Sequence, residues 1–418
     1  MTITEDKKRL ISNFFSLSVL QGLNMFLPLI TLPYLVRVLE VENFGLINFV
    51  LSIVMYFNIL VNFGFELSAT REISIHRDDN KKVSMIFSSV MLIKSFLFVV
   101  SFIILTLMIL SFQNFAEHAW LYYATFGLVL GNVLFPTWFF QGIEQMKYIT
   151  YINFVVRVGF TLLIFVVVKE QDDFIYVPLL TSIGAVLGGI YSLRLVSKQY
   201  KIQLVLPTKE ELISHLKDSY MFFLSRVAND GSRFYAITLI GATFGNSVVG
   251  YYSMVEKLYF AFMSVGGIVA QTIYPYMSRT KNIQFFKKIL SMVAFAVVVL
   301  LGPVLYFHNE ILNLVFGIES EMASLIFIII FSGSIFGVIN ALMGYPLLAA
   351  FGYINHANNS LIYASFIYAI IITITALFLE NIYWTSFSIV LYALSALLFR
   401  LYYIYKTKLF VDKKIKKD

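Results

Sequence analysis

Apolar stretches long enough to cross a lipid bilayer recur along the whole of this 418-residue chain. A membrane-spanning helix needs roughly 20 predominantly apolar residues. Only α-helices and closed barrels pair every backbone hydrogen-bonding group within hydrocarbon, and runs of this length indicate helices. The composition agrees, because 59% of the residues are hydrophobic and 13% are charged, against about 25% charged residues in soluble domains. We therefore predict an all-α integral membrane protein.

The lengths of these stretches predict about twelve transmembrane helices in two bundles of six. The stretch at 218–241 also fits a surface helix, because it has a polar face, and its span would then move to about 234–254. A longer cytoplasmic linker divides the chain. It gives an N-terminal six-helix bundle over 1–198, a linker with an amphipathic helix over 199–217, and a C-terminal six-helix bundle with a basic tail over 218–418. The expected spans lie near 12–39, 45–68, 83–111, 119–141, 149–168, 175–196, 218–241, 247–273, 286–307, 322–345, 357–379 and 383–405.

The linker contains a pattern that is typical of the start of a helix. Thr208 and Glu211 have the spacing of a capping box, in which each side chain accepts a hydrogen bond from the other residue's backbone N–H. Leu212, Ile213 and Leu216 follow as an apolar stripe, which predicts a short helix at the membrane interface. The same segment also fits an ordinary tether between two bundles.

Basic residues collect in every second loop. Lysine and arginine accumulate on the cytoplasmic side of membrane proteins, whereas the opposite loops here are short and contain Lys169 and little else. We therefore expect both termini in the cytoplasm, and we read the net charge of +7 as topology rather than as nucleic-acid binding. The basic positions on this side include Lys7, Lys8, Arg9, Arg71, Arg77, Lys81, Lys82, Lys147, Lys198, Lys201, Lys209, Lys217, Arg279, Lys281, Lys287, Lys288, Lys406 and Lys408.

Ionisable residues within the apolar stretches are the candidates for a functional site. Four polar residues share one face of the helix expected at 218–241, at spacings of i, i+3, i+4 and i+7; they are Arg226, Asn229, Asp230 and Arg233. A charge at the bilayer centre costs on the order of 2.5–3.5 kcal/mol, so such residues usually face a hydrated interior. The alternative for each residue is an interhelical pair or a side chain that reaches the interface.

The charges deep in the spans are mostly cationic. A cavity lined in this way has a positive potential and attracts an anion, and arginine binds phosphate through paired hydrogen bonds. A phosphate-bearing substrate is therefore favoured. The candidates for substrate binding are Lys94, Arg157, Arg226, Arg233, Arg37 and Lys257. The candidates for ion coupling are the carboxylates Asp230, Glu66 and Glu256.

Motifs of known catalytic sites are missing from the sequence. The chain contains no G-x-x-x-x-G-K-[ST], no H-E-x-x-H and no G-x-S-x-G. It has no cysteine, and its five histidines are scattered near span ends or in loops. We therefore expect no catalytic residues, no cofactor and no metal site, and we predict that the protein is not an enzyme.

Three stretches at expected helix ends form motifs. They are PYLVRVLEVENFG at 33–45, NFGFELSATREIS at 62–74, and PTWFFQGIEQMKYI at 136–149. Together with NFFSL near residue 13, they resemble the polysaccharide flippases of the Wzx type, in the multidrug/oligosaccharidyl-lipid/polysaccharide exporter superfamily. The third stretch is the most specific. We interpret all three as helix-end and packing motifs rather than as a binding site.

The resemblance implies a flippase that moves undecaprenyl-diphosphate-linked oligosaccharide repeat units, such as O-antigen, from the cytoplasmic to the periplasmic leaflet of the bacterial inner membrane. It also implies a cationic central cavity, alternating access and coupling to H⁺ or Na⁺. Such a cavity must release the diphosphate again, and Asp230, one helical turn from Arg226 and Arg233, is placed to draw the arginines back.

Two alternatives stay open. A multidrug or ion antiporter of the same superfamily would have an anionic or aromatic cavity. A membrane-embedded glycan polymerase or ligase would need a large outer loop, and the outward-facing loops of this chain are short.

Overall fold

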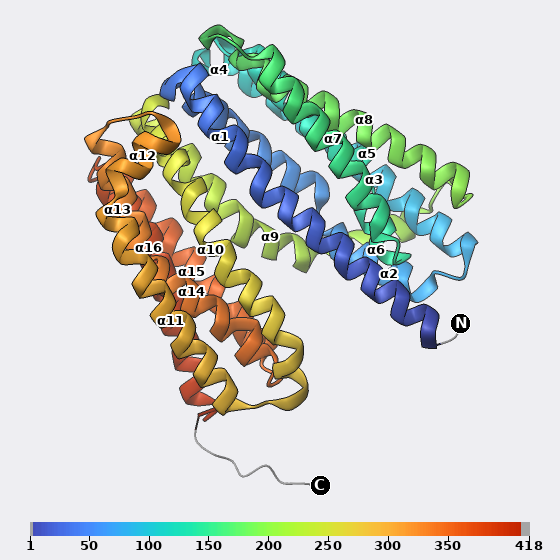
Figure 1. Cartoon of the computed structure of the whole chain (residues 1–418). Coiled ribbons are helices and arrows are strands. Elements are labelled where there is room, and N and C mark those ends of the chain that lie inside the picture. Colours follow the sequence, from blue (N-terminus) through green and yellow to red (C-terminus); the bar gives the residue numbers. More distant parts are fainter. Residues whose placement is uncertain (1–2, 411–418) are drawn as a thin grey trace. The chain divides into compact units, whose positions relative to one another are not determined.

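The computed structural model of the chain describes residues 3–410 (Figure 1), and the side chains of residues 3–12, 14, 15, 17, 18, 24, 25 and 229 lie outside that description. Residues 3–410 form helices joined by short loops, with no strands, which confirms the all-α prediction. The chain divides into two compact units, Met1–Phe234 and Tyr235–Asp418.

The first unit contains the helices up to α8 and the larger part of α9. Their bounds are α1 (Ile3–Asn62), α2 (Phe65–His76), α3 (Asn80–Ser111), α4 (Gln113–Ala116), α5 (Ala119–Leu134), α6 (Thr137–Gly142), α7 (Met146–Val167), the 3₁₀ helix η1 (Gln171–Ile175), α8 (Tyr176–Gln199) and α9 (Lys209–Phe244).

The second unit contains the last turns of α9 and the helices that follow. Their bounds are α10 (Asn246–Thr280), α11 (Ile283–Tyr306), α12 (His308–Phe316), α13 (Glu321–Ser332), α14 (Ser334–Leu342), the π-helix η2 (Met343–Ala349), α15 (Ile354–Leu377) and α16 (Ile382–Lys406).

Ten helical stretches in the described part of the chain are long and apolar enough to cross a membrane, by length and composition. One of them, Val19–His76, covers most of the first expected span and all of the second, because the element α1 joins two helices across a kink at Glu40, whose φ of 61° and ψ of 169° are not helical. The helix α9 is not among the ten, since its polar residues lower its hydropathy. The multi-pass membrane prediction is confirmed, while a total of twelve spans stays a prediction.

The helix α9 begins at the linker. The backbone N–H of Thr208 donates to Oε2 of Glu211 at 2.8 Å, and the N–H of Glu211 donates to Oγ1 of Thr208 at 3.3 Å. The predicted capping box is therefore confirmed. The helix then continues without a break to Phe244, so the expected linker helix and the seventh expected span are one helix. Leu212 and Leu216 pack against a core cluster of the first unit, and their place at a membrane interface stays a prediction.

The motif at 136–149 packs α6 into the first unit. Trp138, Phe139 and Phe140 are each 0% exposed. A Cβ on Gly142 would lie 2.6 Å from Cγ2 of Ile73, so a glycine is needed where α6 approaches α2. These contacts confirm the interpretation of this stretch as a helix-end and packing motif.

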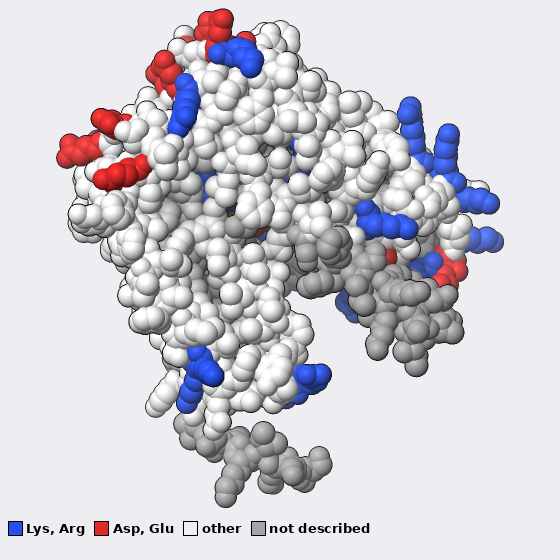
Figure 2. Space-filling view, in the orientation of Figure 1, with Lys and Arg blue, Asp and Glu red and all other residues white. Residues whose placement is uncertain are grey.

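Uncharged side chains cover the long sides of the helices. On the face shown in Figure 2, most charged residues gather at helix ends, with a broad uncharged surface between them. The helix α11 illustrates this surface, because Phe295 is 72% exposed and Met292 is 56% exposed. Large exposed apolar side chains along a 24-residue helix suit contact with lipid rather than water.

Candidate functional site

A cluster of three charged side chains joins α2 to α9 in the first unit. Nη2 of Arg226 lies 2.8 Å from Oε2 of Glu66, and Nη1 of Arg226 lies 2.9 Å from Oδ2 of Asp230. We call Glu66, Arg226 and Asp230 the Arg226 cluster. Its side chains are 40–44% exposed, so the cluster can be reached from outside the packed core.

The contact between Arg226 and Asp230 follows from their i, i+4 spacing on one helix. The contact with Glu66 does not, because Glu66 is 160 positions away in the sequence. Arg226 therefore faces two carboxylates, and the cluster is acidic overall when both are ionised. The sequence predicted a lysine- and arginine-lined cavity, whereas the structure shows one of its arginines already occupied by anions.

The contact surface between α2 and α9, which we call the seam, holds these three residues in position. Further along α2 from Glu66, Oγ of Ser68 lies 2.6 Å from Oγ of Ser219 on α9, and Oε2 of Glu72 lies 3.0 Å from Nδ1 of His215 on α9. The backbone makes the seam tight at the turn before α2, where Gly64 has a φ of 78°. A Cβ there would lie 2.8 Å from the backbone N of Phe223 and 2.8 Å from the backbone O of Ser219.

Aromatic packing fixes the same turn. The rings of Phe63 and Phe223 stack with a centroid distance of 4.7 Å and an interplanar angle of 12°. Next to the cluster on α9, the carbonyl of Gly231 accepts a hydrogen bond from the hydroxyl of Tyr56 at 3.4 Å. The position of Arg226 relative to Glu66 therefore depends on several contacts between α9 and the α1–α2 turn.

A second polar group lies within the bundle of α1, α3 and α5. Lys94 is 2% exposed, and its Nζ donates to the backbone carbonyl of Asn132 at 2.9 Å. Nδ2 of Asn132 donates to Oδ1 of Asn58 at 2.8 Å, and Asn62 donates to the same oxygen at 3.3 Å. Glu66 of the Arg226 cluster interacts electrostatically with Lys94. Lys94 is thus a buried cation in a network of amides and not an exposed residue of a cavity wall.

The other predicted site residues lie on several helices. Arg37 on α1 and Arg233 on α9 are exposed, and so is Arg157 on α7, whose Nε donates to Oδ1 of Asn153 at 3.3 Å. Glu256 and Lys257 are neighbours on α10 in the second unit, where Glu256 is 1% exposed and Lys257 is half-buried. Of the predicted residues, the structure brings Arg226, Asp230 and Glu66 into direct contact, and the roles of all of them stay predictions.

Sequence reasoning missed one buried cation. Arg400 on α16 is 3% exposed, and its guanidinium donates to Oγ of Ser360 at 3.0 Å, to the carbonyl of Ala357 at 3.4 Å and to the carbonyl of Asn340. No carboxylate within the described residues pairs with it. Arg400 lies within the span expected at 383–405, so its place in an apolar run was a usable signal. The asparagines at 58, 62 and 132, within expected spans, were a usable signal for the Lys94 network.

No group of three or more histidine, aspartate and glutamate side chains in the described part of the chain could hold a metal ion. The contacts of the Arg226 cluster and of Lys94 are hydrogen bonds and ion pairs. This arrangement can exchange one anion for another at Arg226, because a phosphate group can replace a carboxylate as the partner of a guanidinium.

Comparison with known proteins identifies similar sequences. The model of the family described as polysaccharide biosynthesis protein matches residues 10–281. The chain is 31% identical over 308 residues to a protein of Escherichia coli (strain K12) named "Putative O-antigen transporter", covering 71% of this chain and 74% of that protein. It is 27% identical over 279 residues to a protein of the same name from Shigella dysenteriae, covering 66% and 69% of the two chains.

Solved structures share the fold at low sequence identity. The lipid II flippase MurJ in an inward closed conformation has a TM-score of 0.68 at 16% identity, with 95% of this chain and 87% of that chain covered. An inward-facing multidrug resistance MATE family transporter of the MOP superfamily has a TM-score of 0.66 at 12% identity, with 92% and 95% covered. At these identities the likeness concerns the fold alone.

Proposed function

This chain belongs to the polysaccharide biosynthesis protein family, and on that premise we propose that it is a flippase for lipid-linked oligosaccharides. It is a membrane transporter and not an enzyme. The substrate we propose is an undecaprenyl-diphosphate-linked repeat unit, such as O-antigen, carried from the cytoplasmic to the periplasmic leaflet of the bacterial inner membrane by alternating access. Both termini then lie in the cytoplasm.

The observation that supports this proposal most directly is the Arg226 cluster. In the structure Arg226 is held by Glu66 and Asp230 at 2.8 and 2.9 Å. A diphosphate that binds Arg226 has to displace these carboxylates, and the carboxylates can later displace the diphosphate. Binding and release then use the same residue, which is what a flippase needs, because it must let go of the anion that it captures.

The same exchange provides a route for ion coupling. When diphosphate occupies Arg226, Glu66 and Asp230 lose their cation and can take up H⁺ or Na⁺ instead. Binding of substrate and of the ion would then be linked, and reciprocally so. The membrane potential also helps outward movement of an anion when the inside is negative, by about 2.3 kcal/mol per charge for each 100 mV.

The test compares carboxylate variants in the purified full chain. Asp230→Asn and Glu66→Gln should bind the lipid-linked oligosaccharide, or a soluble diphosphate analogue, at least as tightly as the wild type, because a competing anion is gone. Their flipping rates in proteoliposomes should fall strongly, because the arginine is no longer drawn back from phosphate. Arg226→Ala should lose binding, and Arg226→Lys should restore it only in part, since lysine lacks the paired donors.

Glu72→Gln is the matched control. Glu72 lies on α2 in the same seam but contacts His215 rather than Arg226, so its removal should leave diphosphate binding unchanged. Weaker binding by the cluster variants at every pH, or flipping at the wild-type rate, would rule out this exchange and leave Asp230 and Glu66 as structural counter-ions.

One observation favours the antiporter alternative. The Arg226 cluster has two carboxylates for one arginine, and a cationic drug would be attracted to such a site. Export of ethidium from cells that overproduce the protein, together with normal surface glycan in a deletion strain, would support this alternative and exclude the flippase.

A further inference from the structure

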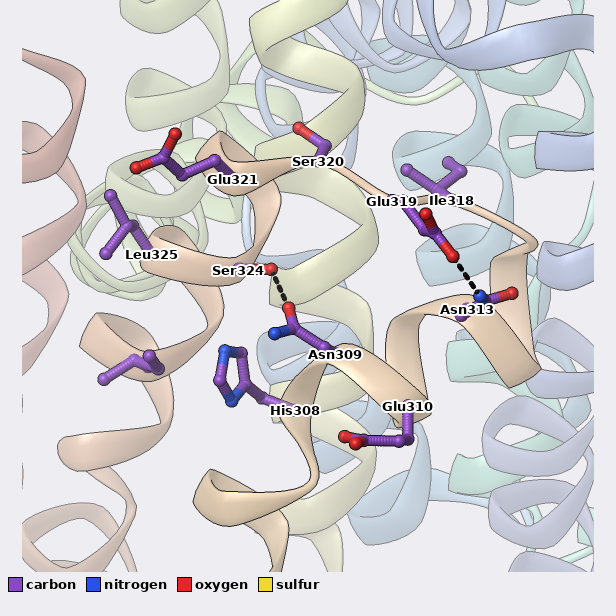
Figure 3. A pocket seen from close by; sticks show the side chains of 11 residues that line it. His308, Asn309, Glu310, Asn313, Ile318, Glu319, Ser320, Glu321, Ser324 and Leu325 are labelled. Atoms are coloured by element: carbon purple, nitrogen blue, oxygen red, sulfur yellow. Dashed lines mark hydrogen bonds between the residues drawn. The ribbon is translucent and has the colours of Figure 1, made fainter.

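A polar cavity lies at the corner between α12 and α13 in the second unit (Figure 3). Its volume is about 680 Å³, within the range of roughly 300–1,000 Å³ that is usual for ligand pockets. It is separate from the Arg226 cluster, whose residues belong to the first unit. No step of the proposed exchange at Arg226 uses it.

The loop charges place this cavity on the outer side of the membrane. The helix α11 begins directly after the basic segment that contains Lys281, and it includes Lys287 and Lys288 in its first turns. It then runs for 24 residues, which is about 36 Å of helix and enough to cross the hydrocarbon core. The cavity follows its far end, so cytoplasmic lysines at one end imply a periplasmic cavity at the other.

The walls of the cavity are fixed by packing and hydrogen bonds. Leu312 and Phe316 anchor the short helix α12, at 2% and 1% exposure. Nδ2 of Asn313 donates to Oε1 of Glu319 at 2.8 Å, and Ser324 on α13 is hydrogen-bonded to Asn309 on α12 (Figure 3). The cavity is therefore preformed between two helices rather than enclosed by a free loop.

The lining combines amides, hydroxyls and carboxylates, and it contains no lysine or arginine. Glu310 and Glu321 are exposed and, in the described part of the chain, make no ion pair. Carboxylates accept hydrogen bonds from hydroxyl groups, and amides both donate and accept. This set suits a ligand with many hydroxyls, whereas three glutamates repel phosphate and acidic groups.

We propose that this cavity binds uncharged or amine-bearing sugar residues of the lipid-linked oligosaccharide at the outer face of the protein. The inference rests on the proposed flippase function and adds a second contact for the same substrate. The sugars enter the acidic cavity, and the diphosphate is kept out of it.

The experiment measures binding of the sugar part alone. The probe is the oligosaccharide repeat unit from the bacterium that carries this protein, freed of its lipid diphosphate by mild acid, and the readout is saturation-transfer NMR with the full chain in nanodiscs. Glu310→Gln combined with Asn313→Leu should weaken binding at least tenfold. Leu325→Trp, which fills the cavity from α13 without changing a polar group, should have the same effect.

Two controls separate the cavity from the rest of the protein. Glu117→Gln removes an exposed carboxylate from the loop after α4, and it should leave binding of the probe unchanged. Arg226→Ala should also bind the probe normally, because the probe has no diphosphate, although it should not flip the lipid-linked form.

The other outcomes of the binding and flipping measurements each overturn the sugar-binding inference or the flippase function. Wild-type flipping of the lipid-linked form without any binding of the free oligosaccharide would overturn this inference and leave the flippase standing. Equal binding by the wild type and both cavity variants would also overturn it, as would binding of spermidine with no binding of the sugar. If the wild type neither flips the lipid-linked form nor binds the sugar, the proposed function fails first.

Discussion

Substituting Gly64 by alanine should loosen the seam that holds Arg226 beside Glu66. Gly64 has a φ of 78°, and a Cβ there would lie 2.7 Å from Cβ of Phe222, 2.8 Å from N of Phe223 and 2.8 Å from O of Ser219. Two of these three atoms belong to the backbone of α9, so no side-chain rotation can relieve the crowding.

The cost has two parts. A left-handed backbone costs an L-residue about 1–2 kcal/mol, and overpacking typically adds about 1–3 kcal/mol. We therefore expect Gly64→Ala to destabilise the protein by about 2–5 kcal/mol, or to move α9 away from α2 so that the ion pair to Glu66 lengthens.

Two other glycines give matched controls for the same chemical change. Gly245 has a φ of 87° and a ψ of 175°, a region that is essentially restricted to glycine, but nothing lies within 4 Å of its would-be Cβ, so Gly245→Ala should show a backbone cost without crowding, about 1–3 kcal/mol. Gly231 has no positive φ, and its would-be Cβ meets Val227 at 3.9 Å and Tyr56 at 4.0 Å. Gly231→Ala should be neutral or stabilising by about 0.5–1 kcal/mol, since alanine favours the helix.

The assay is the thermal unfolding midpoint of each variant in one detergent at one heating rate, combined with the flipping rate in proteoliposomes. The expected order of midpoints is Gly231→Ala highest, then Gly245→Ala, then Gly64→Ala. A Gly64→Ala protein with the midpoint and flipping rate of Gly245→Ala would refute the reasoning, because the close approach of α9 would then contribute nothing.

Further outcomes concern the buried cations and the topology. Lys94→Met should lower the unfolding midpoint, by about 1–3 kcal/mol of stability, because the carbonyl of Asn132 loses its donor inside the bundle; a midpoint at or above that of the wild type would contradict this contact. Arg400→Met should lower the unfolding midpoint, at about 1–3 kcal/mol for each buried acceptor left without a donor, and a midpoint equal to that of the wild type would contradict the contacts described. Topology reporters fused after Lys82, Lys147, Lys201, Lys281 and Lys408 should all give a cytoplasmic signal. A periplasmic signal after Lys201 would contradict the prediction of six spans on each side of the linker.

Hydropathy predicted the helices because lipid imposes a simple requirement on each one. The span expected at 383–405 is α16 (Ile382–Lys406), and the span expected at 286–307 is α11 (Ile283–Tyr306). The kink at Glu40, where φ is 61° and ψ is 169°, lies between the spans expected at 12–39 and 45–68, although only one non-helical residue separates the two helices. Hydropathy gave no sign that α9 runs unbroken from the linker into the following apolar stretch.

The candidate site was predictable only within one helix. The spacing of Arg226 and Asp230 was enough to place them in contact, since neighbours at i and i+4 meet on any helix. Glu66 joins them because the turn at Gly64 sets α2 against α9, and such a pairing of distant segments leaves no local pattern. The central position of Lys94 in the span expected at 83–111 likewise placed it in the membrane. Whether its side chain faces water or protein depends on how α5 packs against α3.

The burial of Lys94 has a consequence for how the chain is made. Synthesis proceeds from the N-terminus, so α3 leaves the ribosome before α5, which contains Asn132, 38 positions after Lys94. A lysine at the centre of an entering helix costs about 2.5–3.5 kcal/mol, which the mean hydropathy of 2.5 in α3 offsets. The ammonium group of Lys94 gains its hydrogen bond to the carbonyl of Asn132 only when α5 packs against α3. The hydrogen bond from Lys94 to Asn132 therefore favours the packing of α5 against α3 during synthesis. A chain that ends between the two helices would contain Lys94 without this acceptor.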